Sequence, residues 1–66
     1  MNWDQIEGSW KEQKGKLMTT WGKLTHDDIE SVAGKRTTLL GLLQSRYGRA
    51  KEDAEHEIDL WAAKLK

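Results

Sequence analysis

Apolar residues recur every three or four positions along this chain, and no proline interrupts the pattern. At 100° per residue, six of them in the first third fall on one face of a helix. These six residues are Trp3, Ile6, Trp10, Leu17, Trp21 and Leu24. The alternation of apolar and polar residues that marks strands is absent, so the sequence predicts an all-α fold.

The first helical segment carries two boundary signals. Gly22 follows the last turn of the apolar face and predicts a helix stop, because glycine readily adopts the left-handed conformation in which many helices end. Ser9 and Glu12 have the spacing of a capping box. This spacing leaves open a short turn followed by a longer helix.

The clearest helix start lies at Thr25. Thr25 and Asp28 have the spacing of a capping box, in which each side chain satisfies a backbone amide of the other residue. Leu24 and Ile29 flank the cap at the positions of a hydrophobic staple. The sequence therefore predicts a short helix from about His26 to Ala33 that ends at Gly34.

Two further amphipathic stripes predict that the rest of the chain is helical as well. The third helix ends at Gly48, and its expected buried residues are Leu39, Leu40, Leu43 and Tyr47. The expected buried residues of the fourth helix are Ala50, Ala54, Ile58, Trp61 and Leu65. Acidic residues lie in the first turns of this helix, where the helix dipole favours negative charge.

The glycines indicate an internal repeat. Gly8, Gly15 and Gly22 are spaced by seven residues, and so are Gly34, Gly41 and Gly48. A shift of 26 residues aligns the two sets and also matches Trp21-Gly22-Lys23 with Tyr47-Gly48-Arg49. The repeat predicts a small four-helix domain built from two similar α-hairpins, residues 2–33 and 35–65, that close one core.

Length and net charge limit the classes of function that the chain can have. Sixty-six residues make a single domain, 1–66, of modest stability, because a chain this short buries only about 60% of its unfolded surface. Eleven basic and eleven acidic residues cancel, so net charge provides no general attraction to nucleic acid or anionic membranes. No apolar run approaches the ~20 residues of a membrane span, and the N-terminus lacks the features of a signal peptide. We therefore expect a cytoplasmic protein with no membrane contact.

Several motifs resemble those of the CsbD-like family of small bacterial stress-response proteins. The most specific are Trp21-Gly22-Lys23-Leu24-Thr25 followed by Asp27-Asp28, and Arg46-Tyr47-Gly48. The resemblance covers nearly the whole chain. It implies a cytoplasmic protein that accumulates in general stress responses and has no established biochemical activity. It also implies two crossed helical hairpins, similar to the arrangement of SAM domains.

Leu42 and Leu60 depart from the family pattern, which usually has polar residues at these positions. Both lie about 100° from the centre of the apolar stripe of their helix, as judged from the 3.6-residue period. Isolated exposed leucines are common on monomers, so this offset alone does not require a partner. The sharper hypothesis is that at least one of them extends a contact surface for self-association or for an unknown protein partner.

A block of basic residues offers an alternative function. Residues 34–51 contain no acidic residue, and the basic ones are Lys35, Arg36, Arg46, Arg49 and Lys51. Such a block is compatible with phosphate contacts in a nucleic-acid-associated helical module. Acidic residues flank it on both sides, and helix dipoles favour the same charge order. We therefore expect no appreciable binding to nucleic acid.

The sequence predicts no catalytic or cofactor site. No nucleophile motif surrounds the serines, and the glycines do not form a phosphate-binding loop. Glu52, His56 and Asp59 have a spacing that suits a metal, but an exposed polar helix face produces the same spacing readily. All four tryptophans lie on predicted buried stripes, so core packing explains them better than base stacking. We therefore expect a non-enzymatic protein without metal or cofactor.

Overall fold

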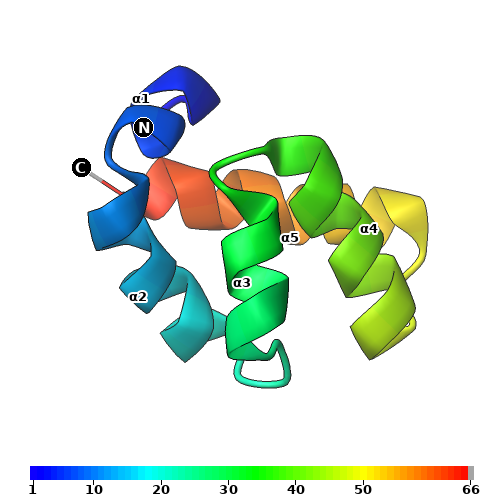
Figure 1. Ribbon diagram of the computed structural model, residues 1–66. Helices are drawn as coiled ribbons and strands as arrows, with labels where there is room; N and C mark the ends of the chain where they lie inside the picture. The colour runs from blue at the N-terminus through cyan, green and yellow to red at the C-terminus, as the bar shows by residue number, and fades with distance from the viewer. Residues whose placement is uncertain (66) are drawn as a thin grey trace.

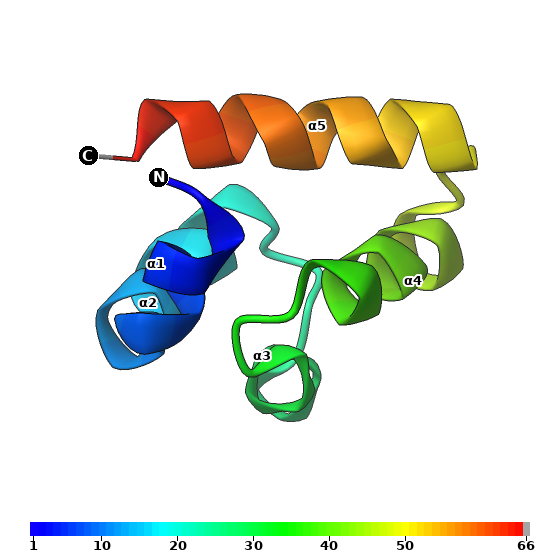
Figure 2. The ribbon, with the colours of Figure 1, turned by 90° about the horizontal axis from the view of Figure 1, so that it is seen from above.

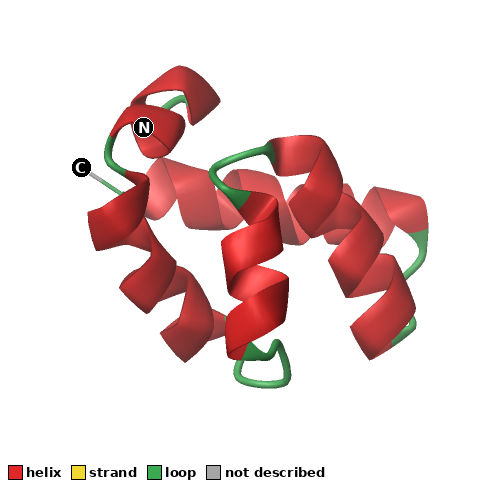
Figure 3. Ribbon diagram, in the orientation of Figure 1, coloured by secondary structure: helices red, strands yellow, loops and turns green. Residues whose placement is uncertain are grey.

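The computed structural model describes residues 1–65 and confirms the all-α class (Figure 1). The described chain folds into five helices instead of the four expected. They are α1 (Trp3–Gly8), α2 (Trp10–Thr20), α3 (His26–Val32), α4 (Arg36–Tyr47) and α5 (Lys51–Lys64). Short loops join them (Figure 3). No helix within the described residues has the length and apolar content needed to cross a bilayer.

The additional helix arises because the first segment breaks at Ser9. Asn2 and Gln5 form a capping box that starts α1, with Gln5 N donating to Asn2 Oδ1 at 2.9 Å and Asn2 N to Gln5 Oε1 at 3.1 Å. The break lies where the sequence allows a short turn before a longer helix, but the predicted capping box of Ser9 and Glu12 is wrong. The Ser9 hydroxyl instead donates to the Gln5 carbonyl at 2.8 Å, at the end of α1.

Two glycines end helices as predicted, and one does not. Gly34 and Gly48 have φ angles of 79° and 66°, in the left-handed region, and follow α3 and α4. Gly22 is outside that region, and α2 ends at Thr20 with Trp21 as its cap. The expected glycine stop at Gly22 is therefore wrong.

The predicted cap of α3 is confirmed. Asp28 N donates to Thr25 Oγ1 and Thr25 N donates to Asp28 Oδ2, both at 3.1 Å. Leu24 and Ile29, the expected staple residues, are both buried. The helix ends one residue before the expected Ala33, because Ala33 already adopts a left-handed φ of 47°.

One apolar core joins all five helices. Its buried members are Ile6, Leu17, Trp21, Leu24, Ile29, Val32, Leu39, Leu43, Ala54, Ile58, Trp61, Ala62 and Leu65. Trp61 lies at the centre of an aromatic group, with its ring centroid 6.0 Å from that of Trp3 and 5.6 Å from that of Trp21. Trp10 is only partly buried, and Ala50 is exposed as the residue preceding α5, so both lie outside the buried core.

Helix α5 forms one side of the molecule, and the other four helices lie on the same side of it (Figure 2). Helices α4 and α5 contact each other, and α4 crosses α5 steeply in the view of Figure 1. The backbone nitrogen of Met1 donates to the carbonyls of Ala62 and Leu65, at 2.8 and 3.1 Å, which holds the start of the chain against the end of α5. The crossed, SAM-domain-like pairing of hairpins 2–33 and 35–65 stays a prediction.

Candidate functional site

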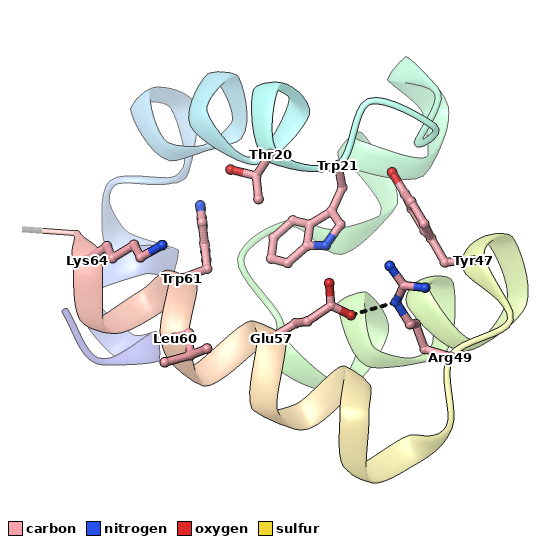
Figure 4. A pocket seen from close by; sticks show the side chains of 8 residues that line it. All are labelled: Thr20, Trp21, Tyr47, Arg49, Glu57, Leu60, Trp61 and Lys64. Atoms are coloured by element: carbon pink, nitrogen blue, oxygen red, sulfur yellow. Dashed lines mark hydrogen bonds and ion pairs between the residues drawn. The ribbon is translucent and has the colours of Figure 1, made fainter.

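The end of α2, the end of α4 and one flank of α5 enclose a groove of about 330 Å³ (Figure 4). Its lining residues are Thr20, Trp21, Tyr47, Arg49, Glu57, Leu60, Trp61 and Lys64. Aromatic and aliphatic side chains thus meet charged ones in one open hollow, the composition expected of a binding site. We call this surface the α5 groove.

Apolar side chains form the middle of the α5 groove. Trp21 and Trp61 are 4% and 6% exposed, and their rings are inclined by 59°. Leu60 directly precedes Trp61 in α5 and is 50% exposed, the highest value among the large apolar residues described. The groove therefore combines a rigid aromatic wall with one projecting leucine.

Polar contacts fix the end of the groove nearest α4. Arg49 Nε donates to Glu57 Oε2 at 2.8 Å (Figure 4). The Arg49 guanidinium carbon lies 5.5 Å from the centre of the Tyr47 ring, and Lys23 Nζ lies 5.3 Å from the same point. The Tyr47 hydroxyl accepts a hydrogen bond from Lys23 N at 3.0 Å. Cations thus hold the Tyr47 ring in place through its negative π face.

The chain reaches this geometry through Gly48. Its left-handed conformation ends α4, and Arg49 N donates back to the Leu43 carbonyl at 3.4 Å. This back-bond turns the chain toward α5 in the manner of a Schellman motif. Along α5, Glu57, Leu60 and Lys64 share one flank, because positions three, four and seven residues apart lie on the same face of a helix. An acid and a base therefore lie on either side of the leucine.

The structure separates the five basic candidates into three arginines that form ion pairs and two exposed lysines that are not among the ion-paired residues of the described chain, 1–65. Arg36 pairs with Asp59 at 3.1 Å and with Glu55 at 3.8 Å. Arg46 pairs with Asp28 at 3.0 Å, and Arg49 with Glu57. The ion pairs formed among residues 1–65 do not include Lys35 or Lys51, and both are exposed. Only Arg49 lines the α5 groove, and a role of the block in phosphate binding stays a prediction.

The Asp28–Arg46 ion pair joins α3 to α4. The Asp28 pKa lies below its ordinary value, first because Arg46 donates hydrogen bonds to the carboxylate and then because the Thr25 backbone does so. The same contact raises the pKa of Arg46. This pair lies outside the groove lining, so its role is to hold α3 against α4.

The two leucine candidates lie in different surroundings. Leu60 lines the α5 groove, whereas Leu42 is partly buried and packs against the core. The structure therefore does not bring them together on one surface. A contact role for either leucine stays a prediction, and the groove now gives Leu60 the better position for it.

Sequence reasoning missed the groove because it assigned Trp21, Tyr47 and Trp61 to the core. The assignment is correct for the two tryptophans, and Tyr47 is only partly buried. A 3.6-residue period shows which face points inward, but not where neighbouring helices leave the edge of that face open. Among residues 1–65, no group of three or more histidines or acids could hold a metal, and Glu52, His56 and Asp59 do not form one.

Comparison with known proteins identifies the family. A model of the CsbD-like family matches residues 4–56. UPF0337 protein RPA4217 of Rhodopseudomonas palustris is 46% identical over the whole length of both chains. UPF0337 protein ECA0631 of Pectobacterium atrosepticum is 52% identical, and UPF0337 protein YjbJ of Escherichia coli 49%, each over 92% of this chain and 88% of the relative. No solved structure is significantly similar. The chain therefore belongs to the CsbD-like family.

Proposed function

We propose that this protein is a non-enzymatic stress-response protein that acts through protein contacts, with the α5 groove as its contact surface. One observation carries the proposal: Leu60 is 50% exposed beside an aromatic groove whose rim also carries the charged residues Arg49, Glu57 and Lys64. Projecting aliphatic and aromatic groups within a polar rim are the composition of protein interfaces. The stress-response role and a cytoplasmic location are parts of the proposal that follow from the family resemblance.

The polar groups of the groove support a role in binding over a role in catalysis. The Thr20 hydroxyl donates to the Lys16 carbonyl at 2.9 Å, and the Glu57 carboxylate accepts from Arg49. The Tyr47 hydroxyl is engaged by the Lys23 backbone. A nucleophile needs a base within hydrogen-bond reach. In this groove the hydroxyls and the carboxylate have structural partners instead.

The nucleic-acid alternative has less support from the geometry. Arg36, Arg46 and Arg49 each face a carboxylate at 3.1 Å or closer. Phosphate binding would have to replace these contacts before any counterion is released from the nucleic acid. Two lysines of the block, Lys35 and Lys51, are exposed without that competition.

The proposal is tested by replacing the gene in its own bacterium with a Leu60→Lys variant. Protein level and survival are measured under osmotic, heat, acid and stationary-phase stress, against the parent and a deletion strain. Leu60→Lys should accumulate like the parent and behave like the deletion. The matched control is Met18→Lys, because Met18 is 39% exposed but does not line the groove.

Two results would contradict the proposal. Protein levels that stay constant under all four conditions would remove the stress-response role. A Leu60→Lys strain that survives like the parent, under a stress that kills the deletion strain, would remove the groove as the contact surface. Circular dichroism of the purified variants establishes that each is folded before the strains are compared.

A further inference from the structure

The groove-facing flank of α5 carries its charges in a self-complementary order. Glu57 lies three residues before Leu60, and Lys64 lies three residues after Trp61. An acid, two apolar residues and a base therefore follow one another along one side of the helix. If two such helices pack antiparallel about a two-fold axis between Leu60 and Trp61, Glu57 of each faces Lys64 of the other.

We propose that the α5 groove binds the α5 flank of a second copy of this chain, antiparallel and with two-fold symmetry. This inference rests on the proposed function, which makes the groove a contact surface, and it names the partner. Leu60 of each copy then packs against Trp61 of the other, at the centre of the contact. Such an isologous interface uses the same patch twice.

Shape supports this occupant. Leu60 projects from the surface with half of its area exposed, and the hollow of about 330 Å³ lies directly beside it. Each copy therefore offers both a projecting side chain and a hollow to receive one. The hollow is lined by Trp21 and Trp61, whose rings are already held by the core. Little side-chain freedom is lost when a leucine packs against the exposed edges of such rigid rings.

Charge selects the antiparallel direction. Arg49 holds the Glu57 carboxylate through Oε2, and a carboxylate can accept further hydrogen bonds, so Glu57 can also accept one from a lysine. Lys64 is exposed and takes no part in the ion pairs among residues 1–65. A parallel pairing would instead place Glu57 against Glu57 and Lys64 against Lys64, and like charges in contact disfavour it.

The size of the α5 flank limits the affinity of the proposed dimer. Helix α5 has 14 residues, so it is about 21 Å long at 1.5 Å per residue. One flank of that length covers less than the roughly 800 Å² per partner of a standard stable interface. Contacts below this size are typically weak and transient, so we expect the dimer only at high protein concentration, on the order of 0.1–1 mM.

Analytical ultracentrifugation of the purified chain from about 10 μM to 1 mM tests the inference, together with charge-swap variants. The parent should dimerise as concentration rises. Glu57→Lys and Lys64→Glu should each weaken the dimer about tenfold, because each creates a like-charge contact across the interface. The double variant Glu57→Lys, Lys64→Glu should restore dimerisation, and an equimolar mixture of the two single variants should form a heterodimer.

Controls separate the interface from general effects of the substitutions. Glu57→Lys also removes the contact with Arg49, but the double variant lacks that contact too, so its recovery reports the pairing between copies. Met18→Lys should dimerise like the parent. Thermal melts of dilute samples show that every variant is folded. A parent that stays monomeric at about 1 mM, or single variants whose mixture stays monomeric, would overturn the inference.

The two proposals fail in different ways. If the parent is monomeric but Leu60→Lys still loses its function in the cell, the groove contacts another protein and the second copy is wrong. If the charge-swap pattern is obtained but Leu60→Lys keeps full function in the cell, the dimer stands and the proposed function is wrong.

Discussion

Arg46 donates two hydrogen bonds to the largely buried carboxylate of Asp28, from Nε to Oδ2 at 3.1 Å and from Nη2 to Oδ1 at 3.0 Å. The same carboxylate accepts from the backbone of Thr25, so one side chain caps α3 and holds it to the last turn of α4. Bidentate arginine–carboxylate contacts of this kind are strong because both groups are charged and planar.

This contact predicts a specific dependence of stability on pH. The Asp28 pKa is lowered in the folded protein, chiefly by Arg46, so folding favours the ionised carboxylate. The stabilisation is therefore complete above the unfolded carboxyl pKa of about 4 and is lost as the pH falls through the folded value. Thermal melts between pH 7 and pH 2 should show a falling melting temperature below about pH 4.

The matched variant for this prediction is Arg46→Gln, which keeps the Thr25 contacts of Asp28. It should melt lower than the parent at pH 7, and the difference should shrink as the pH approaches 2. Glu30 contributes with the same sign, because Lys14 lowers its pKa in the same way, so Lys14→Gln serves as the parallel control. A constant difference between parent and Arg46→Gln from pH 7 to pH 2 contradicts the assignment.

The cap itself predicts a second effect. Thr25→Ala removes the oxygen that accepts from Asp28 N, so the free energy of unfolding should fall by about 1 kcal/mol. Thr25→Ser keeps the oxygen and should be nearly neutral. Urea unfolding followed by circular dichroism measures both variants. Equal losses from the two substitutions would mean that the threonine methyl group, and not its hydroxyl, matters at this position.

The third prediction ranks the effects on stability of Gly→Ala substitutions at four positions. At Gly34 an added Cβ would lie 2.6 Å from Glu7 Cα, and φ is already left-handed, so Gly34→Ala combines strain with a backbone clash. Gly48→Ala meets no atom within 4 Å but keeps the left-handed φ, so it should cost about 1–2 kcal/mol. Gly34→Ala should cost clearly more.

The helical glycines are the matched controls. An added Cβ at Gly15 or Gly41 meets nothing within 4 Å. Alanine is the better helix former, so each substitution should stabilise the protein by about 0.5–1 kcal/mol. Chemical unfolding measures the free energy of unfolding of all four Gly→Ala variants and so tests this ranking. If Gly34→Ala costs no more than Gly48→Ala, α1 does not pack closely against the loop after α3.

These glycines also show how far sequence reasoning reaches. The pattern around Thr25, Gly34 and Gly48 predicted two helix ends and one helix start, because caps depend on neighbouring residues alone. The contact of Gly34 with Glu7 joins residues 27 positions apart and leaves no local signal. An added Cβ at Gly15 or Gly41 would meet no atom within 4 Å, so neither glycine is required by the close approach of another segment.

In the candidate site, too, local features could be predicted from the sequence and contacts between distant residues could not. The offset of Leu60 from its apolar stripe was visible in the sequence, and the residue is exposed. The partners of the basic residues were not visible, because Arg36 meets Asp59 and Arg46 meets Asp28 only after the helices have packed. Asn2 and Gln5 also have the spacing of a capping box, which is a local sequence signal for the start of α1.

A fourth prediction concerns the aromatic centre. Trp61 is 6% exposed and lies against both Trp3 and Trp21, so Trp61→Ala should cost about 3–5 kcal/mol. A small domain has little more stability than this, so most of the variant should be unfolded at room temperature. Trp10→Ala is the comparison, since Trp10 is only partly buried, and it should stay folded. A cooperative melt of Trp61→Ala close to that of the parent contradicts the central position of Trp61.

The last prediction concerns nucleic acid. Because three arginines of the basic block are held by carboxylates, we expect no appreciable binding to duplex or single-stranded DNA or RNA at physiological salt. Fluorescence anisotropy with labelled 20-residue oligonucleotides, at about 20 mM and then about 150 mM salt, measures this. If weak binding occurs at low salt, Lys35→Gln and Lys51→Gln should each reduce the affinity more than Arg36→Gln does. Both lysines are exposed and take no part in the ion pairs formed among residues 1–65. Submicromolar affinity at the higher salt, lost in Arg36→Gln, Arg46→Gln or Arg49→Gln, would reverse the ranking. The arginines would then exchange carboxylates for phosphates, and the basic block would be the functional surface in place of the α5 groove.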